Sequence, residues 1–217
     1  MNTDYSNLLA LYDRSLDDFR GVLDRVDDRS LRLPTPCTGW DVADLLAHVV
    51  EENHRFRVAV TAAVDRPRPA AETGSVNSSG PAATTGPTRA PEPESRTDAL
   101  ERIRKQWEES VAALRNDFAE AQPEASAHLE GFPGITVALA LRMQLLDTVV
   151  HAWDLAQALG LDHRPATDLV SFVAGFATVI ATRSPDGTPG VFAGPLTLAS
   201  SDLWDSALAA LGRTALR

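Results

Sequence analysis

The chain of 217 residues has little cysteine, little positive charge and no long apolar run. Cys37 is the only cysteine, so neither an internal disulfide nor a cysteine-rich metal knuckle can form. No apolar stretch approaches the roughly 20 residues of a membrane helix, and the first residues lack the basic head and apolar run of a signal peptide. We therefore expect a cytoplasmic protein that does not enter a membrane.

Basic residues are outnumbered, with Lys and Arg totalling 20 against 30 Asp and Glu, for a formal net charge of −10. An acidic chain repels phosphate backbones and anionic lipid, which argues against nucleic-acid binding and peripheral membrane binding. The 44% of apolar residues is typical of a globular protein with its own core. We expect a small-molecule partner, and a monomer and a homodimer both remain open.

Apolar residues recur at three- and four-residue intervals in four long segments, which is typical of amphipathic helices. These segments are 4–28, 38–64, 97–119 and 135–159, with Thr38 as the expected cap of the second, and shorter helices are expected at 166–183 and 202–212. No segment shows the strand–helix alternation of a nucleotide-binding α/β sheet. The sequence predicts an all-α fold, a four-helix bundle with additional C-terminal helices, in one domain over residues 1–217.

Two segments interrupt the helical pattern. Residues 65–96 contain six prolines among Gly, Ser, Thr and Ala and have almost no large apolar side chain. Such a segment cannot bury enough surface to offset its conformational entropy, so we expect a long, flexible, Pro-rich loop. Residues 127–134 contain two glycines and a proline and predict an extended turn.

Polar residues in the fourth predicted long helix have a spacing that suits the binding of a metal ion. Asp147 and His151 are four residues apart and Asp154 follows three later, so their side chains lie on one helical face. A carboxylate and an imidazole placed in this way can bind one divalent cation. The alternative is a charged pair that faces water, and spacing alone favours that plainer interpretation.

The second helix offers another half-site. His48 falls on the polar side of this helix together with Asp44, Glu51 and Glu52. A solvated histidine paired with these acids is one interpretation. The other is that antiparallel helices of the bundle bring His48 to the ligands of the fourth helix.

Two motifs in these helices resemble one known family. The segments Pro-Thr-Pro-Cys-Thr-Gly-Trp-Asp-Val, residues 34–42, and Asp-Leu-Leu-Ala-His-Val, residues 44–49, are similar to the second helix of the mycothiol-dependent maleylpyruvate isomerase family. Residues 147–156, Asp-Thr-Val-Val-His-Ala-Trp-Asp-Leu-Ala, resemble its later metal-binding helix, and residues 208–213 resemble its closing helix in DinB-like actinobacterial members. The resemblance spans most of the chain outside 65–96.

The resemblance implies a DinB-like four-helix bundle with His48, Asp147 and His151 as metal ligands. The better-known isomerases have a glutamate where this chain has Asp147, whose side chain is one methylene shorter. Two imidazoles and one carboxylate leave coordination positions open, as at catalytic zinc sites. We expect Zn2+, and Fe2+ or Ni2+ also suit these ligands.

The function implied by the resemblance is a mycothiol-dependent transferase or isomerase, in which the metal presents a thiolate to a small electrophilic substrate. One alternative is a metal-dependent hydrolase or lyase that uses metal-bound water, with Glu51 or Glu52 as the base. Another is a non-enzymatic protein that binds a metal or a small molecule. Thiol-dependent activity separates the first from the second, and retained metal without turnover indicates the third.

Other polar and aromatic residues have less specific roles. Asp154 either orients a ligand histidine or faces solvent. Cys37 precedes a helix and suits a hydrophobic staple better than a reactive thiol. The sequence favours packing roles for two tryptophans and surface positions for three histidines, which are Trp40, Trp153, His54, His128 and His163.

Overall fold

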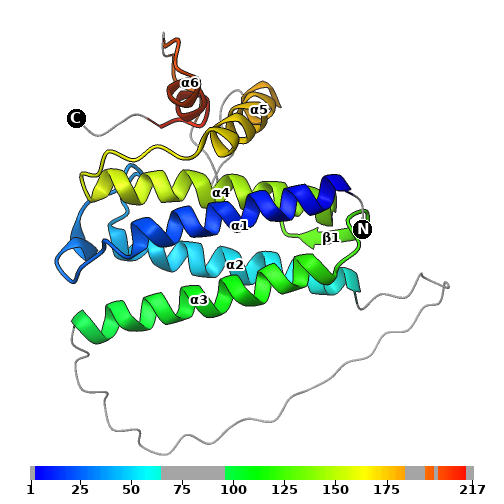
Figure 1. Cartoon of the computed structure of the whole chain (residues 1–217), viewed down its shortest axis with the longest axis horizontal. Coiled ribbons are helices and arrows are strands. Elements are labelled where there is room, and N and C mark those ends of the chain that lie inside the picture. Colours follow the sequence, from blue (N-terminus) through cyan, green and yellow to red (C-terminus); the bar gives the residue numbers. More distant parts are fainter. Residues whose placement is uncertain (1–2, 65–95, 184–193, 198–199, 214–217) are drawn as a thin grey trace, which may run out of the picture.

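Four long helices form the body of the molecule (Figure 1). The computed structural model describes residues 3–64, 96–183, 194–197 and 200–213. The bundle helices are α1 (Thr3–Leu23), α2 (Val42–Val64), α3 (Arg96–Glu120) and α4 (Val137–Ala158). Helices α1 and α4 run in one direction and α2 and α3 in the other, so α2 and α4 pack antiparallel. The all-α fold predicted from the apolar periodicity is confirmed.

Two further helices follow the bundle, α5 (Thr167–Arg183) and α6 (Leu203–Ala210), and they pack against each other beside α4 (Figure 1). After α6 the chain turns at Gly212, whose φ of 74° is in the left-handed region that favours glycine. This turn directs Arg213 back toward α4. No helix among the described residues is long and apolar enough to cross a membrane.

The predicted extended turn is a small antiparallel hairpin of β1 (Ser126–Leu129) and β2 (Phe132–Thr136). Leu129 pairs with Phe132, which leaves a two-residue loop that contains Gly131 with a φ of 81°. The hairpin leads directly into α4, which begins where the Thr136 hydroxyl accepts a hydrogen bond from the Leu139 amide.

The start of α2 differs from the prediction that Thr38 caps it. The Asp44 amide donates to the Asp41 carboxylate and the Asp41 amide donates to the Asp44 carboxylate, both at 3.0 Å, so Asp41 is the cap. Thr38 lies in the preceding turn, because the chain doubles back between Pro34 and Asp41. This turn fixes Cys37 and Trp40 close to the first turns of α2.

Large apolar side chains fill the space between the four helices. Phe19 and Trp107 stack with ring centroids 5.2 Å apart, and the rings of Tyr12 and Phe118 form an edge-to-face pair. Several boundaries differ from the prediction. The largest difference is at α1, which ends at Leu23 and not at 28, and Arg96 already belongs to α3. The rest of the predicted 65–96 loop lies outside the described residues.

Candidate metal centre

His48, Asp147 and His151 come together between α2 and α4. One ligand atom from each lies within 4.8 Å of the other two, and the imidazole centroids are 5.1 Å apart. His151 is only 5% exposed, so the alternative in which it faces water is wrong. The antiparallel packing of two helices therefore joins the two half-sites that spacing alone left separate.

His151 is held from both sides of its ring. Its Nδ1 lies 3.0 Å from Asp154 Oδ2, and its Nε2 lies 3.3 Å from Asp147 Oδ1. Asp154 is fully buried and does not face solvent. An imidazole bonded through one nitrogen to a buried carboxylate has its orientation and tautomer fixed, as ligand histidines in metal sites do.

The charges of the cluster change the proton affinity of its members. Burial opposes the charged form of His151, but Asp147 and the hydrogen bonds to Asp147 and Asp154 outweigh it and raise its pKa well above the usual value. Burial, together with the positive charge of His151, lowers the pKa of His48. Burial raises the pKa of Asp147, yet His151 outweighs this and lowers it overall. The two histidines therefore differ in charge. His151 keeps its additional proton beside the ionised Asp147, whereas the neutral form of His48 is favoured.

The donor set fits a divalent cation. Two imidazoles and one carboxylate are ligands that zinc and Fe2+ both accept, and they leave positions for a further ligand. The ring nitrogen of His151 that faces Asp147 is the one that Asp154 does not use. A cation on that nitrogen would replace a proton, so binding is coupled to the pKa of His151.

Arg213 is a member of the cluster that sequence reasoning missed. Its Nη2 donates to Asp154 Oδ2 at 3.1 Å, and the residue is only 9% exposed. The Cys37 thiol donates to the same oxygen at 3.4 Å. Cys37, His151 and Asp154 form a second group whose candidate ligand atoms lie within 4.8 Å of one another. The one feature of the sequence that points to Arg213 is its place at the end of the C-terminal motif, residues 208–213.

The two glutamates considered as bases have different surroundings. Glu51 is exposed on α2, whereas Glu52 is half-buried and forms an ion pair with Arg55. Burial raises the pKa of Glu52, and the negative charge of Asp147 adds to this effect against the opposing Arg55. Glu52 is therefore the better placed of the two to accept a proton.

The remaining singled-out residues are placed as follows. Trp153 is buried in the core and Trp40 packs against the core, as predicted. The ring centroid of Trp40 also lies 4.7 Å from that of His48, so Trp40 borders the centre. His54 and His128 are exposed, as predicted. The surface prediction is wrong for His163, which is half-buried with its Nε2 3.1 Å from Asp18.

Comparison with known proteins gives one family and two similar folds. The family model described as the mycothiol maleylpyruvate isomerase N-terminal domain matches residues 12–156. A crystal structure of the mycothiol-dependent maleylpyruvate isomerase superposes with a TM-score of 0.59 at 16% identity, covering 88% of this chain and 73% of that one. A histidine-to-alanine mutant of that enzyme gives a TM-score of 0.66 at 16% identity, covering 97% and 90%. No curated protein matches the sequence significantly.

Proposed function

This chain belongs to the family of the mycothiol maleylpyruvate isomerase N-terminal domain, and from that premise we propose that it is a metal-dependent enzyme using a thiol cofactor. The reaction is a thiol transfer or an isomerisation of a small electrophilic substrate, and mycothiol is the proposed thiol. The observation that carries the proposal is the convergence of His48, Asp147 and His151 within 4.8 Å.

The proposed ligands divide the work of holding a cation. His48 and His151 supply neutral nitrogens, and Asp147 supplies a negative charge. Zn2+ is the proposed ion, with Fe2+ and Ni2+ as alternatives, and when bound it lowers the pKa of a coordinated thiol. Asp154 keeps a proton on Nδ1 of His151, and Arg213 holds Asp154 in place.

Cys37 is the only cysteine of the chain and is half-buried, so the proposed nucleophile is an external thiol. A thiolate attacks an electrophilic carbon, so the proposed substrate is a small electrophile. Maleylpyruvate isomerisation is the reaction named for the two similar structures, so it is the first one to assay. Glu52 and Asp154 are paired with Arg55 and Arg213. Asp147 and the exposed Glu51, in contrast, favour a cation and disfavour a strongly anionic substrate. A less charged electrophile is therefore the second substrate to assay.

A second candidate function is a metal-dependent hydrolase or lyase that uses water in place of a thiol. The observation that favours it is the half-buried Glu52, whose raised pKa suits a general base. Glu52→Gln should then abolish activity that does not depend on added thiol. Under the thiol-dependent proposal, the same variant retains activity once thiol is supplied.

The test is metal analysis of the purified protein beside His48→Ala, Asp147→Ala and His151→Ala. We expect the wild type to hold about one equivalent and each variant to bind more than about 100-fold more weakly, since an outer-shell partner alone is worth 10–100-fold. His54→Ala is the matched control, because His54 lies on α2 but is exposed. Equal metal content in all five proteins would contradict the proposed site.

A further inference from the structure

A layer of buried polar side chains crosses the bundle, with one residue from each of the four helices. Gln144 of α4 donates to Asn53 of α2 at 2.8 Å, and Asn53 donates to Ser110 of α3 at 2.9 Å. Tyr12 of α1 faces the same Gln144 side chain. All four are buried, and Gln144 lies one helical turn before Asp147, so the layer adjoins the candidate metal centre.

Three polar atoms at this junction share one property. Among the described residues, no hydrogen-bond partner is present for the Tyr12 hydroxyl, for Gln144 Oε1 or for Asp147 Oδ2. Buried polar groups in native proteins are nearly always hydrogen-bonded. The three atoms do not bond to one another, so a shared water is what can satisfy them, and the Tyr12 hydroxyl is the only donor of the three.

The charge of Asp147 acts on Tyr12. Burial raises the pKa of Tyr12 well above its usual range, the Gln144 side chain opposes this rise and the carboxylate of Asp147 adds to it. The hydroxyl therefore keeps its proton and stays a donor. Tyr12 has no exposed surface, so it cannot touch a substrate.

The two oxygens of Asp147 have separate surroundings. Oδ1 lies 3.3 Å from His151 Nε2, on the side of the candidate ligands, whereas Oδ2 is buried and without a partner among the described residues. A donor that engages Oδ2 would hold Oδ1 toward the two imidazoles. Such an anchor has particular value for an aspartate, because its short side chain sets the distance from α4 to the cation.

We propose that Tyr12 is a positioning residue, whose hydroxyl donates a hydrogen bond to one water that in turn donates to Asp147 Oδ2 and thereby presents Oδ1 to the cation. This inference rests on the proposed metal site. It gives α1, which carries none of the proposed ligands, a role in metal binding. It also ties the centre to the polar layer through Gln144.

The test is the affinity for Co2+, measured by competition with a chelator, together with the visible spectrum of the bound ion. Tyr12→Phe removes only the hydroxyl, and Tyr5→Phe is its matched control, because Tyr5 lies on the same helix and donates to the Phe118 carbonyl at 2.8 Å. We expect Tyr12→Phe to weaken Co2+ binding by about tenfold or more and to change the spectrum, as the loss of an outer-shell partner does. Tyr5→Phe should bind like the wild type.

The outcomes separate this inference from the proposed function. If Asp147→Ala loses Co2+ while Tyr12→Phe and Tyr5→Phe bind equally well, the positioning role is overturned and the metal site stands. If Asp147→Ala binds Co2+ as the wild type does, both are overturned. A second measurement uses the unmutated protein and so does not depend on the folding of a variant. The Tyr12 hydroxyl proton should give a slowly exchanging NMR signal that shifts when Zn2+ is added. An unshifted signal overturns the inference.

Discussion

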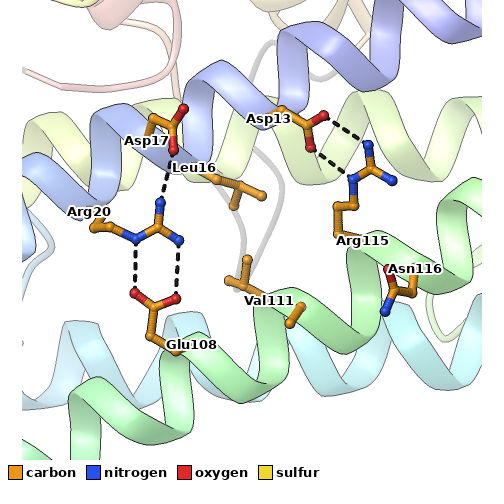
Figure 2. A pocket seen from close by; sticks show the side chains of 9 residues that line it. Asp13, Leu16, Asp17, Arg20, Glu108, Val111, Arg115 and Asn116 are labelled. Atoms are coloured by element: carbon orange, nitrogen blue, oxygen red, sulfur yellow. Dashed lines mark hydrogen bonds and ion pairs between the residues drawn. The ribbon is translucent and has the colours of Figure 1, made fainter.

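Two of the places where charged side chains meet on this bundle have opposite character. Between α1 and α3 lies a groove of about 370 Å³ (Figure 2). There Arg115 forms two hydrogen bonds to Asp13, and Arg20 bridges Asp17 and Glu108. Figure 2 shows the Arg115–Asp13 and Arg20–Glu108 pairs spanning the groove from one helix to the other, whereas Asp17 lies on α1 beside Arg20.

The centre between α2 and α4 has the opposite character. Its donors converge on one point, with His151 buried and His48 and Asp147 half-buried, and one oxygen of Asp147 has no partner among the described residues. In the groove each cation already has its anion, and all of them are near water. Volume and charge alone therefore do not make a binding site. A binding site needs donor atoms that converge on one point and are not already engaged by other groups of the protein.

The largest effect that would test this difference comes from Arg213→Met in the buried cluster. Burial raises the pKa of Asp154, and the charge of Arg213 outweighs this to keep the carboxylate ionised. Removing the arginine leaves a buried charge without its main partner, which costs about 3–5 kcal/mol. Urea unfolding measures the free energy, and a loss below about 1 kcal/mol would contradict the role given to this pair.

The next effect concerns pH in the metal-free protein. The pKa of His151 is raised in the folded state, so the folded protein binds a proton more tightly than the unfolded chain does. This stabilisation is complete below the unfolded pKa of about 6.5 and is lost as the pH rises through the folded pKa. The free energy of unfolding should therefore fall above about pH 6.5, by at most about 1.4 kcal/mol per pH unit.

Urea unfolding in a chelator at several pH values above neutrality measures this dependence. His151→Gln should unfold more easily at pH 6.5 and should lose the decline that the wild type shows at higher pH. The lowered pKa of His48 acts in the other direction, by reducing stability as the pH falls below about 6.5. A wild-type profile that keeps rising above neutral pH would contradict the proton assignment to His151.

Local patterns predicted most of the fold, because each amphipathic helix repeats its apolar residues along one face. The i,i+4 spacing points to Asp147 and His151, but spacing alone favours a pair that faces water, and the family resemblance is needed to combine them with His48 as metal ligands. Arg213 could not be singled out, because it is 59 residues from Asp154 and reaches it only through the turn after α6. Tyr12 gave no polar signal either, since it occupies a core position in an apolar row and its surroundings come from α4.

The smallest expected effect is that of Arg115→Met. This variant makes in the groove the same substitution that Arg213→Met makes in the buried cluster. The side chains of Arg115 and Asp13 are 37% and 42% exposed, and exposed pairs contribute about 0–1 kcal/mol. Salt screens such pairs, so the small difference from the wild type should vanish in about 1 M NaCl, where the Debye length is about 3 Å. The loss in Arg213→Met should persist at the same salt concentration, because its pair is buried. Parallel urea titrations at low and high salt measure the loss in the free energy of unfolding for both variants. If salt changes the two losses equally, burial does not distinguish the groove from the centre.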